Sequence, residues 1–305
     1  MSILVDGKTP VVVQGITGRQ GQLHTEYSMK YGTNIVAGVT PGRGGEAVCG
    51  VPVYNTVHEA VKNHGAVASV FYVPAKAVKG AFEEAIDAGI KLVVGTSEGI
   101  SRQKAAYFRA LAQANGARLV GFNTTGVISA GKCKLGGIGG EDSDYIYVPG
   151  RIGVCSRSGG MGAELSLALK RGGYGVSTVV CMGGDWIVGT PMAEYVRLFE
   201  ADPETDAIVL FCEPGTDNEA ELADYLAQNG LTKPIVALMA GAFQENYPKG
   251  VSFGHAAAMI AKDSQTISAK RRMLGAQGVE IVASLIAIPE KLKDIGIQPV
   301  QGLTS

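Results

Sequence analysis

Charged residues are scarce in this chain, and neither sign dominates. Asp, Glu, Lys and Arg make up 18% of the 305 residues, with 27 basic and 28 acidic side chains. A formal net charge of −1 gives no broad positive field to attract a polyanion, so nucleic-acid binding is not expected. Because apolar residues make up 46%, the sequence is too apolar for a disordered chain.

Cysteine pairs and long apolar runs are also missing. The five cysteines form no C-x-x-C pair, so the pattern predicts neither a disulfide framework nor a zinc site. No run approaches 18 apolar residues, and the start M-S-I-L-V-D-G-K lacks the apolar core of a signal peptide. We therefore expect a cytoplasmic protein with no membrane segment and no metal site of its own.

Glycine is abundant, and short β-branched runs alternate with helical patterns. The 43 glycines favour tight turns and sites lined by backbone. The alternation is typical of βαβ units and parallel sheets, and it predicts a doubly wound α/β domain over 1–122 and a second over 151–305. A glycine-rich segment over 123–150 connects them. The predicted strands cover 9–14, 34–39, 66–73, 91–95, 118–122, 151–156, 177–182, 207–213, 234–240 and 279–282.

The first predicted strand runs into the glycine turn Q-G-I-T-G-R-Q-G. Backbone N–H groups at such a strand-to-helix turn can bind a phosphate, although an ordinary tight turn has the same pattern. The acidic residue that binds ribose in NAD sites is absent about 20 residues further on. The turn T-P-G-R-G-G brings Arg43 to the same crevice, so the pattern favours a phosphorylated nucleotide other than NAD.

Two later strands of this half end in polar and aromatic residues. One ends in Tyr72-Val73-Pro74 and the next in Thr96-Ser97-Glu98. Because the carboxyl ends of parallel strands meet at one edge of the sheet, these residues are expected to border the crevice of the glycine turn. Each segment alone is equally compatible with an ordinary loop.

The first strand of the second half ends in S-R-S-G-G-M, directly before a predicted helix. Hydroxyl groups and consecutive glycines at a helix N-terminus are suited to bind an anion, because unpaired N–H groups and the helix dipole favour negative charge there. An N-cap serine alone would explain one of the hydroxyl groups.

One of the four histidines stands out. His255 lies in V-S-F-G-H-A-A-A-M at the expected start of a helix, where a phosphoryl group on the imidazole would face backbone donors. A helix-capping histidine is the alternative. Glu213 ends a predicted strand before Pro214-Gly215 and is placed to orient an imidazole, or else it is a strand end facing solvent.

Taken in order, these motifs resemble the α-type subunit of the ADP-forming acyl-CoA synthetases, the succinyl-CoA synthetase superfamily. The resemblance runs through Q-G-I-T-G-R-Q-G, G-V-T-P-G-R-G-G, V-C-S-R-S-G-G, M-G-G-D and G-H-A-A-A. It implies a Rossmann-like CoA-binding domain followed by a flavodoxin-like ligase domain. It also implies that His255 is phosphorylated and that Glu213 supports it. The implied phosphate site is Ser158, Gly159 and Gly160, and the implied CoA contacts are Thr17, Gly18, Arg19, Gln20, Arg43, Tyr72, Val73, Pro74, Ser97 and Glu98.

The resemblance extends to the substrate and to a partner. S-R-S-G-G-M and K-L-G-G-I-G-G are similar to ATP-citrate lyase, whereas the succinate enzymes usually have S-R-S-G-T-L. Because a citrate-synthase-like segment is missing, the resemblance implies the small subunit of a citryl-CoA synthetase. It further implies a β-type partner in a hetero-oligomer, whose ATP-grasp domain binds ATP and Mg²⁺, and a small carboxylic acid as substrate.

Two alternatives to citrate ligation are open. One is the α subunit of a succinyl-CoA or malyl-CoA synthetase. The other is a non-catalytic protein of this fold that senses CoA. Retention of His255, Glu213 and S-R-S-G-G together argues against the sensor, because a sensor needs no phosphoryl carrier.

Overall fold

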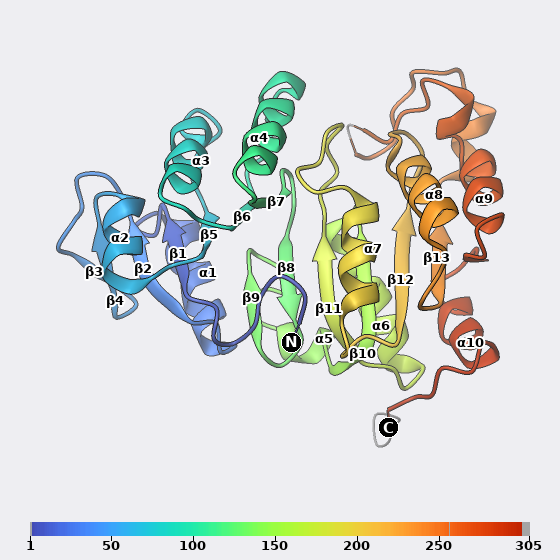
Figure 1. Cartoon of the computed structure of the whole chain (residues 1–305), viewed down its shortest axis with the longest axis horizontal. Coiled ribbons are helices and arrows are strands. Elements are labelled where there is room, and N and C mark those ends of the chain that lie inside the picture. The colour runs from blue at the N-terminus through green and yellow to red at the C-terminus, as the bar shows by residue number, and fades with distance from the viewer. Residues whose placement is uncertain (1, 256, 301–305) are drawn as a thin grey trace. The chain divides into compact units, whose positions relative to one another are not determined.

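The computed structural model describes residues 2–255 and 257–300. The chain forms two compact units. The N-terminal unit consists of Leu4–Asp144 with Ile187–Thr190, and the C-terminal unit consists of Tyr145–Trp186 and the described residues from Pro191 on, with Ser2 and Ile3. Each unit is built around one mostly parallel sheet, so the expected α/β fold class is confirmed (Figure 1).

The sheet of the N-terminal unit has the strand order β3-β4-β2-β1-β5-β6-β7. Its strands pair in parallel except at β3 and β4. The central strands are short runs such as V-V-V-Q and L-V-V-G whose residues are all buried, as expected for a sheet covered on both faces. The bounds are β1 (Val11–Gln14), β2 (Ile35–Val39), β3 (Ala47–Val48), β4 (Val51–Tyr54), β5 (Ala68–Phe71), β6 (Leu92–Gly95) and β7 (Arg118–Gly121).

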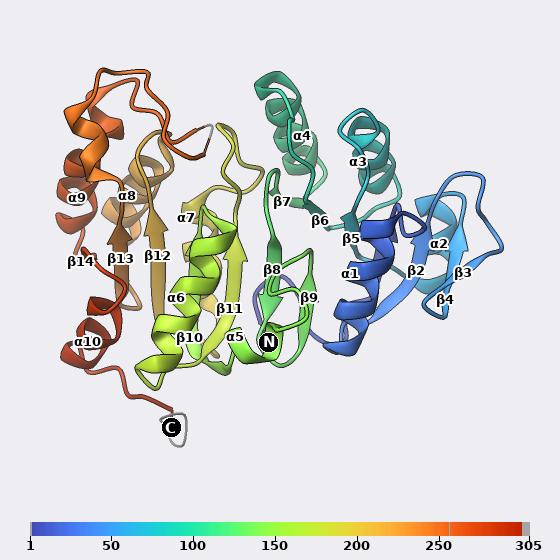
Figure 2. The ribbon, with the colours of Figure 1, turned by 180° about the vertical axis from the view of Figure 1, so that it is seen from behind.

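Helices cover both faces of this sheet. α1 lies in front of it in Figure 2, and α2 lies in front of it in Figure 1. Thr56 begins α2 with a capping box, because its hydroxyl accepts from the Glu59 N–H while the Glu59 carboxylate accepts from the Thr56 N–H. The helices are α1 (Arg19–Lys30), α2 (Val57–His64), α3 (Val78–Asp87) and α4 (Arg102–Ala114).

The glycine-rich connecting segment contains secondary structure that the sequence pattern does not predict. Strands β8 (Gly126–Ser129) and β9 (Cys133–Leu135) pair antiparallel, and a short helix α5 (Ser143–Ile146) follows. A Cβ atom at Gly126 would lie 1.9 Å from the Leu135 carbonyl oxygen, so this position requires glycine. With four and three residues, β8 and β9 are too short to show a clear alternation of apolar and polar residues in the sequence.

The parallel strands of the C-terminal unit have the order β14-β13-β12-β10-β11. All residues of β11, β12 and β13 are buried, so the core of this unit lies on both faces of the sheet. The bounds are β10 (Pro149–Ser156), β11 (Val176–Cys181), β12 (Ala207–Cys212), β13 (Ile235–Met239) and β14 (Glu280–Val282).

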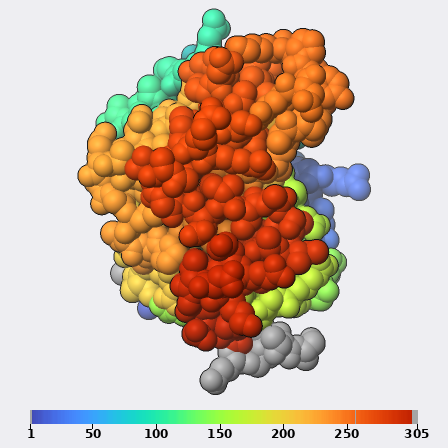
Figure 3. Space-filling view, turned by 90° about the vertical axis from the view of Figure 1, so that its right-hand side faces the viewer, coloured from blue at the N-terminus to red at the C-terminus, as the bar shows by residue number. Residues whose placement is uncertain are grey.

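The helices of the C-terminal unit also lie on both faces of its sheet. α7 and α8 lie in front in Figure 1, α6 lies in front in Figure 2, and the C-terminal part of the chain forms the face seen in Figure 3. The helices are α6 (Gly159–Arg171), α7 (Met192–Ala201), α8 (Asn218–Asn229), α9 (Ile267–Gly275) and α10 (Ala287–Asp294), with 3₁₀ turns η1 (Ala242–Asn246) and η2 (Asp263–Gln265).

Candidate functional site

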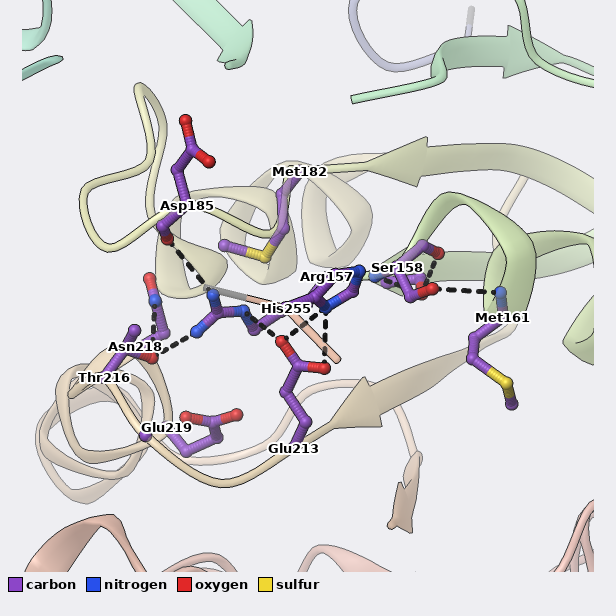
Figure 4. A network of polar contacts seen from close by, with 12 residues as sticks. Arg157, Ser158, Met161, Met182, Asp185, Glu213, Thr216, Asn218, Glu219 and His255 are labelled. Atoms are coloured by element: carbon purple, nitrogen blue, oxygen red, sulfur yellow. Dashed lines mark hydrogen bonds and ion pairs between the residues drawn. The ribbon is translucent and has the colours of Figure 1, made fainter. Parts of the chain in front are cut away.

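The candidate site of the C-terminal unit lies at the carboxyl ends of three neighbouring strands. In the sheet, Ser156 of β10 pairs with Cys181 of β11 and with Phe211 of β12. The segments that follow these strands therefore leave the same edge, which is where doubly wound sheets bind their ligands. They carry Ser158, Gly184 and Glu213, and Figure 4 shows this region from close by.

His255 and Glu213 form the centre of the site (Figure 4). The imidazole Nδ1 lies 3.0 Å from Oε1 and 2.9 Å from Oε2 of Glu213. Glu213 is buried, so it is not a strand end facing solvent, whereas 29% of the His255 side chain is exposed. The hydrogen bond that His255 Nδ1–H donates to the Glu213 carboxylate raises the pKa of His255, although burial of the ring acts in the opposite direction.

The expectation that His255 begins a helix is wrong. His255 lies in a loop closed by a bridge between Ser252 and Met259, and the next α-helix begins only at Ile267. The run A-A-A after the histidine resembles a helix start in the sequence, but its described members Ala257 and Ala258 are buried in the loop. The helix-capping role of the histidine is excluded with it.

Gly184 explains how the imidazole packs, and sequence analysis assigned it no role. A Cβ atom at Gly184 would lie 2.8 Å from both Cγ and Cδ2 of His255. Real side chains do not tolerate such a distance, so the ring requires glycine at this position. The motif M-G-G-D was the only signal in the sequence that marked it.

Ser158 is the N-cap residue of α6, the alternative explanation that the sequence left open for one of the hydroxyl groups. Its hydroxyl accepts a hydrogen bond from the Met161 N–H at 3.3 Å, and the Ser156 hydroxyl donates to the Ser158 carbonyl at 2.7 Å. A Cβ atom at Gly160 would meet only the Ser158 hydroxyl oxygen, at 3.9 Å. The first turn of this 13-residue helix is therefore open at Gly160.

Two buried cations surround Glu213, and neither was singled out from the sequence. The Arg157 side chain is fully buried, and its Nε lies 3.2 Å from Oε1 of Glu213. The Lys270 ammonium group donates to the Glu213 carbonyl at 2.7 Å and to the Gly215 carbonyl at 2.6 Å, and it pairs with Glu219. Buried charges of this kind are invisible in a sequence because their partners are distant along the chain.

The N-terminal unit contains a cavity of about 560 Å³ beside the first glycine turn. Gly15 has φ +76°, and a Cβ atom there would lie 2.8 Å from the Tyr72 carbonyl oxygen. Of the expected CoA contacts, five line the cavity: Thr17, Gly18, Tyr72, Val73 and Pro74. The lining also includes Gln14, Gly15, Val39, Thr40, Pro41, Ala77, Gly80, Ala81 and Glu84.

The other five expected CoA contacts are not among the lining residues. Arg19, Gln20 and Glu98 are exposed. Arg43 is also exposed, and it pairs with Glu46 through an Nη2–Oε2 contact of 2.6 Å. The Ser97 hydroxyl donates to the carbonyl of Val73 at 2.8 Å, so it supports the cavity wall indirectly.

Two residues of the cavity region were missed or underestimated. The Thr40 hydroxyl accepts from that of Thr17 at 3.2 Å, which joins the ends of two neighbouring strands. His24 of α1 is half-buried and stacks on Tyr72 with ring centroids 5.1 Å apart. Neither contact leaves a signal in local sequence spacing.

No three His, Cys, Asp or Glu side chains of residues 2–255 and 257–300 lie together as a metal site. In the same part of the chain, every helix is too short or too polar to cross a bilayer.

Each of the two units contains a segment that matches a known protein family. Residues 6–99 match the model of the CoA binding domain, and residues 149–292 match that of the succinyl-CoA ligase like flavodoxin domain. The chain is 43% identical to succinate–CoA ligase [ADP-forming] subunit alpha 2 of Archaeoglobus fulgidus, over 97% of this chain and 100% of that one. It is 41% identical to malate–CoA ligase subunit alpha of Methylorubrum extorquens, over 92% of this chain and 94% of that one.

A solved structure is similar to almost the whole chain. This is ATP citrate lyase from Methanothrix soehngenii in complex with citrate and coenzyme A, with a TM-score of 0.85 and 26% identity. The match covers 97% of this chain and 52% of the lyase chain. The chain therefore spans about half the length of that lyase.

Proposed function

The chain belongs to the family of α subunits of ADP-forming succinate–CoA ligases, and we propose that it is the α-type subunit of a ligase that joins a carboxylic acid to CoA. In this proposal His255 carries a phosphoryl group and the N-terminal unit binds CoA. The observation that carries the proposal is the contact of both Glu213 carboxylate oxygens with Nδ1 of His255. The relatives named above support the reaction class.

The Glu213 carboxylate selects one form of the imidazole. Because Nδ1–H donates to Glu213, the lone pair remains on Nε2. That lone pair attacks the γ-phosphorus of ATP, an N–P bond forms, and the bond to the ADP oxygen breaks. Glu213 balances the positive charge that the ring acquires, in the way that a triad carboxylate stabilises an imidazolium.

The phosphoryl group then passes to an oxygen of the substrate carboxylate. The N–P bond breaks, an acyl phosphate forms, and His255 returns to its neutral state. The CoA sulfur attacks the acyl carbon, the C–O bond to phosphate breaks, and the thiol proton leaves to solvent. Backbone N–H groups of Ser158, Gly159 and Gly160 at the start of α6 are proposed to stabilise the phosphoryl charge.

ATP and Mg²⁺ are assigned to a β-type partner with an ATP-grasp domain. The relatives are named as alpha subunits, which supports a second kind of subunit. In residues 2–255 and 257–300, no group of three side chains suited to a metal ion is found, so no step is assigned to a metal held by this chain.

Citrate is the acid that we propose. The open space at Gly160 supports a bulky substrate, and so does the similarity to the lyase solved with citrate and coenzyme A. A C4 dicarboxylate, succinate or malate, is the second candidate, favoured by 41–43% identity to ligases named for those acids. A CoA sensor is disfavoured, because it has no use for a carboxylate paired with His255.

The test is to reconstitute the chain with its β-type partner. Incubation with ATP should add one phosphoryl group to His255, detected by mass spectrometry under alkaline conditions that preserve phosphohistidine. ADP release should then require both CoA and an acid, screened over citrate, succinate and malate. Phosphate on a different residue, with His255 unmodified, would refute the proposed mechanism. Faster turnover of succinate or malate than of citrate would overturn the choice of citrate as substrate and leave the proposed reaction intact.

A further inference from the structure

Arg157 is a buried cation that joins three segments at the edge of the C-terminal sheet. It follows β10, and its side chain is fully buried. Its guanidinium donates to the Thr216 hydroxyl, which follows β12, and to the Asp185 carbonyl, which follows β11, the latter at 3.1 Å. Figure 4 shows these contacts around the guanidinium. The planar fork of arginine suits such divergent contacts, which a lysine ammonium group would not reproduce.

The Glu213 carboxylate is shared between this cation and the imidazole. Its Oε1 lies 3.2 Å from Arg157 Nε and 3.0 Å from His255 Nδ1. Oε2 contacts only the imidazole of these two groups, at 2.9 Å. A buried carboxylate is costly unless it is paired, and Arg157 supplies that pairing whatever the charge of the histidine.

We propose that Arg157 is a positioning residue, which fixes the Glu213 carboxylate against Nδ1 of His255 and, by sharing Oε1, keeps the imidazole neutral and nucleophilic. The inference rests on the proposed function, because it assigns Arg157 a part in phosphorylation of His255. The guanidinium acts through Glu213 and is given no contact with the phosphoryl group. It therefore controls the reactivity of the histidine without taking part in bond making.

The charges around His255 come from several elements and act in opposite directions. Glu213, through its hydrogen bond and its charge, raises the pKa of His255, and Asp185 raises it further. Burial and the charge of Arg157 lower it. An imidazolium has no lone pair on Nε2, so a histidine made too basic by its carboxylate would not attack phosphorus near pH 7.

The second buried cation near Glu213 has a different task. Lys270 of α9 contacts the backbone carbonyls of Glu213 and Gly215, and its ammonium pairs with Glu219 of α8 at 2.5 Å. These contacts hold the turn after β12 and leave the Glu213 carboxylate oxygens to Arg157 and His255. Arg157 is thus the cation that touches the carboxylate itself.

The first measurement needs neither ATP nor a partner. The pKa of His255 is followed by ¹H–¹⁵N NMR in the full chain, which has only four histidines, and the signal is assigned with His255→Asn. In Arg157→Gln the pKa should rise by about one unit, because a nearby positive charge and a competitor for Oε1 are lost. In Arg157→Lys the pKa of His255 should lie between those of Arg157→Gln and wild type, because lysine keeps the positive charge but lacks the planar guanidinium.

The second measurement uses the reconstituted complex. The acid limb of the pH profile for His255 phosphorylation should move upward with the NMR pKa, so that Arg157→Gln loses about tenfold in rate near pH 6.5 and less near pH 8.5. Arg151→Gln is the matched control. Arg151 lies on β10, the strand that Arg157 follows, but it is half-exposed and pairs with Asp206, so both readouts should stay unchanged.

Should Arg157→Gln fail to fold, Thr216→Val replaces it. This variant keeps both charges and removes the hydroxyl that holds the guanidinium, so a smaller upward shift in the same direction is expected. An unchanged His255 pKa in a folded variant overturns the inference. A wild-type chain that takes no phosphate on His255 instead overturns the proposed function, and the NMR titration still decides the role of Arg157.

Discussion

The two candidate sites are built from different materials. The cavity of the N-terminal unit is lined by a glycine turn, apolar side chains and hydroxyl groups, and Glu84 is the one carboxylate among its described lining residues. The site of the C-terminal unit contains buried charges, among them Arg157 and Glu213, around a partly exposed His255. Both lie at the carboxyl ends of parallel strands.

The difference fits the two tasks that we propose for the units. Backbone groups and small residues accommodate a ligand at little electrostatic cost, which suits a unit that binds CoA. Buried, paired charges hold a reacting group in a defined protonation state, which suits a unit that transfers a phosphoryl group. Substitutions in the C-terminal site should therefore alter the rate of phosphoryl transfer, and substitutions near the cavity should alter the affinity for CoA.

The largest effect is expected for His255→Asn. The asparagine lacks the nucleophilic nitrogen, so incorporation of phosphate from ATP should be abolished in the reconstituted complex. CoA affinity of the chain, measured by calorimetry, should stay within about twofold of wild type, because the expected CoA contacts are in the other unit. Loss of CoA binding in this variant would contradict the division of tasks.

Glu213→Gln should lower the maximal phosphorylation rate by about 10²–10⁴-fold, because Nδ1–H loses its carboxylate acceptor. The acid limb of the pH profile should move to lower pH, since the group that raises the pKa of His255 is removed. A rate equal to wild type at every pH would show that Glu213 does not act on His255.

The same pair makes stability depend on pH. Because the pKa of His255 is raised in the folded state, its pairing with Glu213 stabilises the fold below the unfolded-state pKa. This contribution is lost as the pH rises through the raised pKa. The difference in unfolding free energy between wild type and Glu213→Gln should thus be larger near pH 6 than near pH 9, in urea titrations at both values.

Gly184→Ala tests whether the imidazole depends on the space at this glycine. The added methyl group would lie 2.8 Å from two ring carbons, so the ring must move, and phosphorylation should slow by about 10²-fold. Gly275→Ala in α9 is the control, because a Cβ atom there meets no atom of the described residues within 4 Å. Equal rates in the two variants would show that the ring position is not limiting.

The sequence predicts the fold well because its signals are local. The alternation of short apolar runs and helical patterns predicted the positions of the main strands. The family resemblance implied that Glu213 supports His255. The helix expected at His255 was wrong, because the loop is held by a bridge and by packing against the body of the unit. Strands β8 and β9 were missed because short strands carry little periodicity.

The remaining site residues were missed for a physical reason. Arg157 lies inside the motif S-R-S-G-G-M, where only the hydroxyl groups and glycines drew attention, and Lys270 lies in no motif. The importance of both residues lies in being fully buried beside Glu213. Burial arises from elements far apart in the sequence. The close approach of Gly184 to the imidazole is likewise a distance between distant segments, which no spacing rule encodes.

Gly160→Thr tests the proposed acid. Among the described residues, a Cβ atom at Gly160 meets only the Ser158 hydroxyl oxygen, at 3.9 Å, so a side chain can begin there and a threonine should narrow the start of α6. The ratio of kcat/KM for citrate to that for succinate should fall by about 10–200-fold, the range that one side chain in a pocket supports. The ratio for Gly160→Ala should lie between those of wild type and Gly160→Thr. An unchanged ratio would remove Gly160 from the acid site.

The smallest effect is expected at Arg43, which follows the cavity-lining residues Thr40 and Pro41 along the chain. Arg43 was expected to contact CoA, yet it is exposed and pairs with Glu46. A phosphate of CoA would have to compete with that carboxylate, so Arg43→Ala should weaken CoA binding by only about two- to fivefold in calorimetry. Glu46→Gln should strengthen binding by a similar factor, because it releases the guanidinium from its partner. Both effects should shrink as salt is raised, since exposed charges are screened. If neither variant changes CoA affinity at low salt, the N-terminal unit binds CoA without Arg43, through the backbone and small residues of its cavity.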